Sequence, residues 1–327
     1  MSKPVIFSGI QPTGELHIGN YLGAVKNWVD LQNSGQYDCY FCIVDYHSIT
    51  SNMIAEERRK NIALMAAELL AIGIDPNKVT LFVQSHVPEV TELDWIFNCI
   101  TTIAELERMT QFKDKSLTQK QNINAGLFTY PVLQAADILL YHGTLVPVGD
   151  DQVQHIELTR NIGRWFNKRF GDYFPETKPL LTEIPKVMSL LEPDKKMSKS
   201  KGEGHVINLS DEPEVIEKKL KKAVTATEGG GKAPGVENLL LLLKQFGDPA
   251  IYKKFAAAEK DGSIRYDDLK VALAEAIGNY FVSFRTKRNE LLAQPGQIIG
   301  ALAAGAEKAR VVAESTMVKV RSMVGIG

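Results

Sequence analysis

Pro4-Val-Ile-Phe-Ser8, followed by the glycine-punctuated run Gly9-Ile-Gln-Pro-Thr-Gly-Glu-Leu-His-Ile-Gly-Asn20, is the stretch that decides the fold. A short apolar run that ends at a glycine predicts a strand, and the residues from Tyr21 to about Asn33 have the pattern of a helix. A strand that leads through a glycine-rich turn into a helix directs backbone N–H groups and a helix N-terminus towards a phosphate. The segment therefore predicts the first part of a nucleotide-binding α/β sheet.

The alternation of strands and helices continues along the chain. Apolar runs predict further strands at residues 37–44, 79–84 and 144–148, and helical patterns cover residues 55–72, 127–141 and 153–170. This alternation favours an open parallel sheet with right-handed crossovers and with ligands at the carboxyl ends of the strands. The expected fold is α/β, a Rossmann-type parallel sheet with helices on both faces.

The C-terminal part of the sequence has helical patterning alone. The composition changes after Ile207, and the helical pattern is broken near Gly247, Gly262 and Pro295. We therefore expect a sheet domain at residues 1–205 and an all-helical domain at residues 206–327. The mostly helical segment at about 91–125 is interpreted as an insertion between the two halves of the sheet.

Composition places the chain among soluble globular proteins. It has 327 residues, of which 44% are hydrophobic and 24% charged. The net charge of -1 gives no global basic field, so a nucleic-acid partner would have to contact local patches. The N-terminal residues lack an apolar signal-peptide region, and the longest aliphatic run, Leu239 to Leu243, is too short for a bilayer. We expect a cytoplasmic protein with no membrane partner.

The three cysteines predict no metal site or disulfide. Cys39 and Cys42 have C-x-x-C spacing but lie within a predicted strand. Residues three apart on a strand point to opposite faces, so these thiols cannot bind one metal ion or each other. We expect them to be buried, and we expect no protein side chain to ligate a metal.

Three motifs are compatible with phosphate binding. Lys195-Lys-Met-Ser-Lys-Ser-Lys201 is either a solvated basic loop or a mobile loop whose ammonium groups contact a polyphosphate. His17-Ile-Gly-Asn20 is either an ordinary helix start or a donor set for phosphate oxygens, and Gly149-Asp-Asp-Gln152 is either a helix N-cap or a second rim of a site. Their occurrence together in one α/β sheet favours a nucleotide site.

These motifs carry a family resemblance. The run from Pro12 to Asn20 resembles the HIGH signature of class I aminoacyl-tRNA synthetases, and Lys196-Met-Ser-Lys-Ser200 matches their KMSKS signature in all five letters. Four other segments resemble bacterial-type tryptophanyl-tRNA synthetases: Phe7-Ser-Gly-Ile-Gln-Pro12, Met109-Thr-Gln-Phe-Lys-Asp-Lys-Ser116, Ala135-Ala-Asp-Ile-Leu-Leu-Tyr141 and Val146-Pro-Val-Gly-Asp-Asp-Gln152. The resemblance covers most of residues 4–202 and continues more weakly to the C-terminus.

The resemblance implies a two-step reaction. The tryptophan carboxylate attacks the α-phosphate of ATP, pyrophosphate leaves with Mg²⁺, and the adenylate is transferred to the 3′-terminal ribose of tRNA. Charge builds on the phosphates in the transition state, so fixed cations and donors should supply most of the acceleration. The implied catalytic residues are His17, Asn20, Lys115, Lys196 and Lys199. The implied ATP-binding residues are Gln11, Pro12, Thr13, Gly19, Asn20, Gly149, Asp150, Asp151, Val187, Lys196, Met197, Ser198, Lys199 and Ser200.

Asp137 is the residue that we expect to select tryptophan. Apolar residues flank it in the sequence, which favours a buried carboxylate over one that faces water. An anionic acceptor in an apolar pocket can pair with an indole N–H, and an amino acid without that donor would leave the carboxylate unpaired. The resemblance implies that Phe7, Val146 and Val148 wall the ring and that Tyr130, Gln152 and His47 hold the ammonium and carboxylate groups. His47 also fits a purely structural role.

Two positions depart from the family pattern. Tyr46 stands where glutamine is expected, and Gln134 stands where many relatives have methionine, which could alter the polarity of the pocket.

The helical domain resembles the anticodon-binding part, and the family is a homodimer with its contact expected at residues 96–109. Candidate tRNA phosphate contacts, each of which also fits a solvated helix face, are Lys218, Lys219, Lys221, Lys222, Arg285, Lys287 and Arg288.

Three alternatives to a dimeric tryptophan–tRNA ligase remain open. The tyrosine enzyme shares the fold and motifs but needs a polar partner for a phenol oxygen. A nucleotidyltransferase of the same superfamily has an H-x-G-H turn without an anticodon-like domain. A paralogue that binds amino acid or RNA without charging tRNA is disfavoured by Asp137 and by the complete lysine-rich segment at residues 195–201, which we call the lysine loop.

Overall fold

The computed structural model describes residues 3–109, 124–149, 152–181, 186–225 and 234–327. By their contacts these residues form two compact units. Unit 1 comprises residues within 1–14, 28–183 and 294–327, and unit 2 comprises residues within 15–27 and 184–293.

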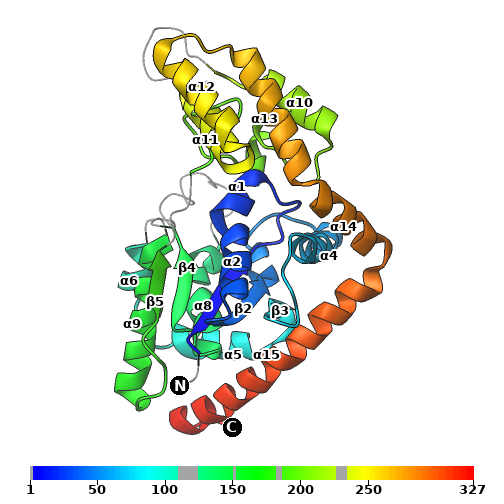
Figure 1. Cartoon of the computed structure of the whole chain (residues 1–327). Helices are drawn as coiled ribbons and strands as arrows, with labels where there is room; N and C mark the ends of the chain where they lie inside the picture. Colours follow the sequence, from blue (N-terminus) through cyan, green and yellow to red (C-terminus); the bar gives the residue numbers. More distant parts are fainter. Residues whose placement is uncertain (1–2, 110–123, 150–151, 182–185, 226–233) are drawn as a thin grey trace. The chain divides into compact units, whose positions relative to one another are not determined.

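The described residues of unit 1 form a five-stranded sheet in which every pairing is parallel (Figure 1). The strand order is β3-β2-β1-β4-β5. The strands are β1 (Val5–Ile10), β2 (Asp38–Ile43), β3 (Thr80–Val83), β4 (Leu145–Val148) and β5 (Lys178–Leu181). The parallel α/β fold is therefore confirmed, and four of the strands lie where the sequence predicted them.

The order of the strands decides where a ligand site belongs. The order reverses between β1 and β4, which pair through Ile6 and Leu145. In open α/β sheets ligands bind beyond the carboxyl ends of the strands at such a reversal. Gln11, Pro12 and Thr13 directly follow β1, and Gly149 directly follows β4. These predicted ATP-binding residues thus lie at the expected edge of the sheet.

The fifth strand, β5, was not predicted. It pairs in parallel with β4 through Lys178, Pro179, Leu180 and Leu181 at the edge of the sheet. Its first and last residues are exposed, and Pro179 removes a backbone donor. Proline is tolerated in edge strands because one side of the strand has no partner strand.

Helices pack on the sheet of unit 1. They are α3 (Asp45–Ser48), α4 (Ala55–Ala71), α5 (Glu89–Asn98), α6 (Ile103–Glu107), α8 (Ala125–Leu140), α9 (Val153–Phe170) and α15 (Pro295–Val324), together with most of α2 (Lys26–Ser34). Helix α8 packs between α5 and α9 and also contacts β1. Asn124 caps α8, because its side-chain oxygen accepts a hydrogen bond from the N–H of Leu127 at 2.9 Å.

Helix α15 lies along β3 and carries the C-terminal residues back to the sheet (Figure 1). Gly305 makes this approach possible, since a Cβ at that position would lie 1.8 Å from the carbonyl oxygen of Leu81 in β3. The guanidinium group of Arg321 near the end of α15 donates two hydrogen bonds to the carboxylate of Glu92 in α5. The C-terminal helix is therefore part of the core of unit 1.

Unit 2 combines a short N-terminal segment with helices from later in the chain. Helix α1 (Ile18–Asn20) continues into a π-helical turn at Tyr21–Val25 and then into the start of α2. The other helices are α10 (Pro213–Lys221), α11 (Pro234–Phe246), α12 (Pro249–Asp261), α13 (Tyr266–Tyr280) and α14 (Val282–Ala293). The ring of Tyr21 packs against Phe246, Tyr280 and Phe281 at centroid distances of 6.2, 6.0 and 5.2 Å.

These units differ from the boundary that the sequence suggested near residue 205. Residues 15–27 group with 184–293 because His17 forms a β-bridge with Asn208 and Leu209 donates its N–H to the carbonyl of Leu16. Residues 294–327 group with the sheet because α15 packs on β3. Both groupings depend on contacts that are remote in the sequence.

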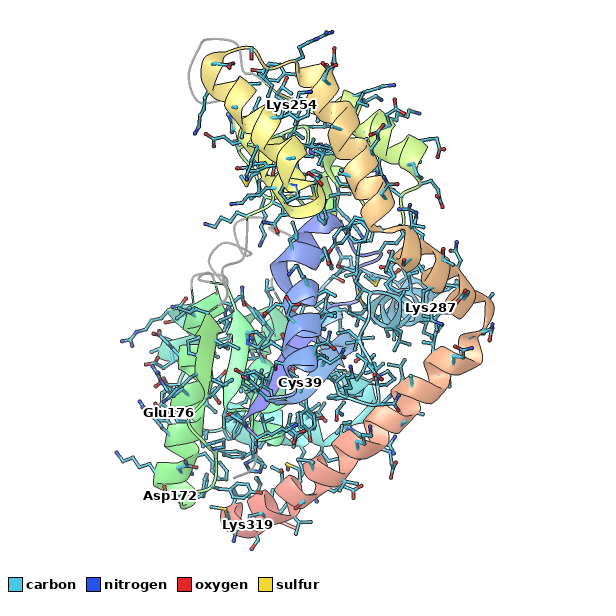
Figure 2. The ribbon with its side chains drawn as sticks, viewed as in Figure 1. Cys39, Asp172, Glu176, Lys254, Lys287 and Lys319 are labelled. Atoms are coloured by element: carbon cyan, nitrogen blue, oxygen red, sulfur yellow. The ribbon has the colours of Figure 1, made fainter. Side chains whose placement is uncertain are left out.

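The burial of two cysteines agrees with the prediction from the sequence. Cys39 and Cys42 are buried free thiols in β2, and Figure 2 shows Cys39 within the sheet region. Burial raises the pKa of both thiols, that of Cys39 to about 11, so they are protonated at neutral pH. Among the described residues, no helix is both long enough and apolar enough to cross a bilayer.

Candidate functional site

Asp137 is a buried carboxylate in the middle of unit 1. Its residue is 2% exposed, on the face of α8 that packs into the core. The Nε2 atom of Gln84 lies 2.8 Å from Oδ1 and 2.9 Å from Oδ2, and the Nε2 atom of His47 lies 3.0 Å from Oδ2. The predicted burial is confirmed. A carboxylate accepts about four hydrogen bonds, so these partners leave roughly one position for a further donor.

Burial raises the pKa of the Asp137 carboxyl group, while the contacts with His47 and Gln84 lower it. A second carboxylate, Asp94 on α5, has its pKa raised to about 6, first by burial and then by the charge of Asp137. The side-chain amide of Asn98 donates to Asp94 at 2.9 Å and limits this rise. The region therefore holds two carboxyl groups that are costly to ionise unless a donor faces them.

Gln84 and Asp94 were not predicted from the sequence. Gln84 directly follows β3, and polar residues at the carboxyl end of a parallel strand are candidates for site residues, so that signal was present. Asp94 lies at an intermediate exposure between Leu93, which is buried, and the exposed Trp95. The pattern of apolar and polar residues around Asp94 in the sequence gave no indication that it lies near enough to Asp137 to feel its charge.

The other predicted tryptophan-binding residues lie in the same unit. The Tyr130 hydroxyl lies 2.9 Å from Nε2 of His155, and the Tyr130 ring meets the His47 ring edge-on at 6.3 Å. Tyr130 and Asp137 are seven positions apart on α8, so they share one helix face. Phe7, Val146 and Val148 are buried in the core, and the Phe7 ring stacks on Tyr141 at 5.8 Å. Gln152 directly precedes α9.

His17 and Asn20 form a reciprocal cap in unit 2. The Asn20 N–H donates to Nδ1 of His17 at 3.3 Å, and the His17 N–H donates to Oδ1 of Asn20 at 3.2 Å. Burial, together with the charges of Lys199 and Lys196, lowers the pKa of His17 to about 4. The imidazole is therefore neutral at pH 7. Because Nδ1 accepts a hydrogen bond, the proton is on Nε2, which is then a donor.

The lysine loop is folded against this cap within unit 2. Met197 is buried, and its N–H donates to the carbonyl of Val187 at 3.0 Å, which pairs two predicted ATP-binding residues. The Ser198 side chain caps the short turn at Lys199–Lys201, and Nζ of Lys199 donates to the carbonyl of Glu15. A Cβ at Gly19 would lie 2.9 Å from the His17 ring and 3.6 Å from Cβ of Met197. Residues 17–20 and 196–200 are thus brought together, as a shared phosphate role requires.

The other charged residues that were predicted to bind ATP or tRNA differ in their surroundings. Lys115, Asp150 and Asp151 lie outside the described residues. Arg285 is 7% exposed and donates to the carbonyl of Gly278 at 2.6 Å, so its predicted contact with tRNA is wrong. Lys219 is paired with Asp211 at 2.7 Å and Arg288 with Glu15, both within unit 2. Exposed candidates are Lys218, Lys221, Lys222 and Lys287, and Figure 2 shows Lys287 extending from α14.

Among the described residues, no group of three histidine, cysteine or acidic side chains could hold a metal ion. The charge of Asp137 acts on Asp94, but both carboxyl groups already have side-chain partners: Asn98 donates to Asp94, and Gln84 and His47 contact Asp137.

The geometry can be compared with known proteins. Residues 1–282 match the family of class I tRNA synthetases for tryptophan and tyrosine. The chain belongs to this family. Tryptophan–tRNA ligase 2 of Streptomyces avermitilis is 47% identical over 338 residues, which cover 99% of this chain and 97% of the relative. The tryptophan–tRNA ligase of Bacillus anthracis is 47% identical over 334 residues, which cover 98% of each chain.

A solved structure of a family member is similar along the whole chain. The tryptophanyl-tRNA synthetase of Campylobacter jejuni in complex with ADP and tryptophan superimposes with a TM-score of 0.86 at 35% identity. The match covers 98% of this synthetase and 100% of the Campylobacter chain. The sequence resemblance and the Rossmann-type fold of this class I synthetase are thereby confirmed.

Proposed function

We propose that this class I synthetase is a tryptophan–tRNA ligase. It activates L-tryptophan with ATP to give tryptophanyl-adenylate and pyrophosphate, and it then transfers the tryptophan to the 3′-terminal ribose of its tRNA. The buried carboxylate of Asp137 is the observation that carries the choice of amino acid. The tryptophan ligases among its relatives, which are 43–47% identical, support the same choice.

Asp137 selects the indole through its N–H group. The carboxylate already accepts hydrogen bonds from Gln84 and His47, and the indole N–H adds one more. Phenylalanine has no donor and leaves that acceptor position buried and empty, at a cost of about 1–3 kcal/mol. Tyrosine carries a phenol O–H that can also donate to a carboxylate. The hydrogen bond to Asp137 therefore excludes phenylalanine, and the choice of tryptophan over tyrosine follows from the tryptophan ligases among the relatives.

In this proposal the residues of the two signature motifs stabilise the phosphates. The Nε2–H group of neutral His17 donates to a phosphate oxygen, and Lys196 and Lys199 approach the leaving pyrophosphate. Lys115 shares that role, and Gln11, Gly19 and Gly149 border the nucleotide. Mg²⁺ enters bound to the phosphate oxygens of ATP, which suits its preference for oxygen ligands and needs no cluster of protein ligands.

The remaining proposals concern partners. The sheet and helices of unit 1 carry the tryptophan site, and the helices of residues 213–293 in unit 2 carry recognition of the tRNA anticodon, with the exposed lysines at residues 218–222 and 287 at phosphates. Trp95 and Ile103 are 70% and 67% exposed on α5 and α6, which supports a homodimer contact at residues 91–125. The chain works in the cytoplasm, where its tRNA and ATP are present.

ATP–pyrophosphate exchange tests this function. The full chain is supplied with ATP, Mg²⁺, labelled pyrophosphate and each amino acid singly. Exchange with tryptophan alone is the expected result. Exchange with tyrosine alone would reassign the enzyme to the tyrosine branch, and the absence of exchange with every amino acid would favour a binding paralogue.

A further inference from the structure

Gln84 is a buried polar residue to which the reaction described above gives no role. It lies where β3 ends, is 1% exposed, and has a hydrogen bond from each end of its side-chain amide. Its Nε2 faces both oxygens of Asp137, and its Oε1 accepts the backbone N–H of Tyr46 at 3.0 Å. The side chain therefore links the start of α3 to the carboxylate that is proposed to accept the indole N–H.

The orientation of this amide is determined by the backbone. A backbone N–H can only donate, so the atom of Gln84 that faces Tyr46 must be the oxygen. The same N–H also contacts Oδ1 of Asp45 at 3.1 Å, and that oxygen accepts the N–H of Ser85 at 2.9 Å. Asp45 thus joins the start of α3 to the turn that carries Gln84, and the amide nitrogen is left facing Asp137.

This fixed nitrogen favours the ionised form of Asp137. An amide N–H₂ group offers hydrogens only, so a protonated carboxyl would direct its own O–H against a donor or give up one of the two contacts. A carboxylate accepts from Nε2 at both oxygens. Hydrogen bonds to the charged form offset the cost of burying the charge. Gln84 also restricts the rotation of the carboxylate, because both oxygens are held by one atom.

The charges around Asp137 show why such a donor is needed. Asp45 and His47 come from α3, Asp94 comes from α5, Cys42 comes from β2, and Tyr141 follows α8. Asp45 and Asp94 are like charges that disfavour ionisation of Asp137, and Cys42 and Tyr141 carry no charge at neutral pH because burial raises the pKa of each. His47 is the only one of these five groups that can bring a positive charge to Asp137.

We propose that Gln84 is a positioning residue for tryptophan selection, which holds the Asp137 carboxylate ionised and oriented so that it accepts the indole N–H. This inference rests on the proposed function, because it concerns the amino acid that Asp137 selects. It does not place Gln84 in contact with tryptophan.

Two substitutions separate this role from a packing role. Gln84→Leu keeps the approximate shape and removes the hydrogen bonds to Tyr46 and Asp137. Gln84→Glu keeps the shape and the acceptor for Tyr46 but sets a second carboxyl group against Asp137. Gln297→Leu, at an exposed position of α15, is the matched control. For each variant, ATP–pyrophosphate exchange gives KM for tryptophan, KM for ATP and kcat across a range of pH.

The expected results differ between the two variants. Gln84→Leu raises the tryptophan KM roughly tenfold to a hundredfold, the loss expected for one hydrogen bond to a charged group, with kcat and the ATP KM nearly unchanged. Its tryptophan KM worsens further as the pH falls, because Asp137 now protonates more readily. In Gln84→Glu the introduced carboxyl imitates the amide only while it is protonated, so the tryptophan KM worsens as the pH rises. A packing role would not give opposite pH dependences.

The outcomes that overturn the inference are distinct from failure of the proposed function. Wild-type protein that gives no tryptophan-dependent exchange contradicts the function itself. Active wild-type protein together with folded variants whose tryptophan KM and pH profile match wild type removes Gln84 from selection. If neither variant folds, a crystal structure of the wild type with tryptophan decides: Nε2 within about 3.2 Å of the Asp137 carboxylate supports the inference, and a Gln84 side chain turned away from it overturns it.

Discussion

Asp137 is a charged side chain with 2% exposure, and the burial of such a group is unfavourable unless hydrogen bonds offset it. Three donor contacts do so here, two from Gln84 and one from His47. The apolar neighbours of Asp137 in the sequence predicted its burial. They could not predict Gln84 as the partner, because that residue is 53 positions away and reaches Asp137 only through the packing of the sheet against α8.

Substitution of Asp137 tests its role directly. Asp137→Asn and Asp137→Ala should each raise the tryptophan KM and reduce the preference for tryptophan over phenylalanine roughly tenfold to a hundredfold, because the indole N–H loses a charged acceptor. The measurement is kcat/KM for both amino acids in pyrophosphate exchange. Asp172→Asn, at an exposed position labelled in Figure 2, is the control. Unchanged discrimination in a folded Asp137 variant would remove the residue from the site.

Lys199 should act on the phosphates and leave tryptophan binding unaffected. Lys199→Ala is expected to slow adenylate formation about a hundredfold to a thousandfold, as loss of one transition-state donor does in other enzymes. Tryptophan affinity, measured by equilibrium binding without ATP, should stay within about twofold of wild type. Lys195→Ala in the same loop is the control, since the Lys195 ammonium pairs with Glu192. Weakened tryptophan binding with normal turnover would contradict the assignment.

The depressed pKa of His17 predicts a dependence of stability on pH. The group titrates at about 4 in the folded chain and near 6.5 when unfolded, so protons bind the unfolded state more strongly. Its contribution to stability is complete above pH 6.5 and is lost as the pH falls to about 4, by at most about 3 kcal/mol. Asp94, whose folded pKa is raised to about 6, has the opposite sign in part of this range.

The effect of His17 is therefore measured as a difference between two proteins. Urea unfolding of wild type and His17→Asn is followed between pH 7 and pH 4, and asparagine retains a side-chain acceptor for the helix cap. The unfolding free energy of wild type should fall relative to the variant as the pH is lowered. A constant difference across this range would show that His17 titrates normally in the folded chain.

At the scale of elements, strands and helices with strong periodic patterns were predicted well. Helix α9 begins and ends where the pattern indicated, at Val153 and Phe170. Strand β5 was missed because it is short and exposed at both ends, and because Pro179 argues against a strand unless its position at the sheet edge is known. The π-helical turn at Tyr21–Val25 was also missed, since its sequence has an ordinary helical pattern.

The contact between α15 and β3 can be tested with two glycines of the same helix. Gly305→Ala should destabilise the protein by about 1–3 kcal/mol or more, because the new Cβ would overlap the Leu81 carbonyl and force the helix from the strand. A Cβ at Gly300 would have no neighbouring side chain or strand within 4 Å, so Gly300→Ala should stabilise the helix by about 0.5–1 kcal/mol. Urea unfolding measures both. Equal stability of the two variants would mean that α15 does not approach β3 closely.

At the scale of the whole molecule, the grouping of segments was the least predictable feature. Residues 15–27 precede the second strand but belong with 184–293, and α15 ends the chain but belongs with the sheet. Sequence patterns report local structure, whereas these groupings depend on a few long-range contacts such as the His17–Asn208 bridge. The consequence for function is that residues 17–20 and 196–200, which are far apart in the sequence, lie in one unit.

Charging of unfractionated tRNA by the full chain tests the central claim most directly. The protein is incubated with ATP, Mg²⁺, tRNA and labelled tryptophan or tyrosine, and the aminoacylated tRNA is then isolated and sequenced. We predict that tryptophan alone is attached and that it is found on the tRNA specific for tryptophan. Attachment of tyrosine, or tryptophan-dependent pyrophosphate exchange without transfer to any tRNA, would contradict this account.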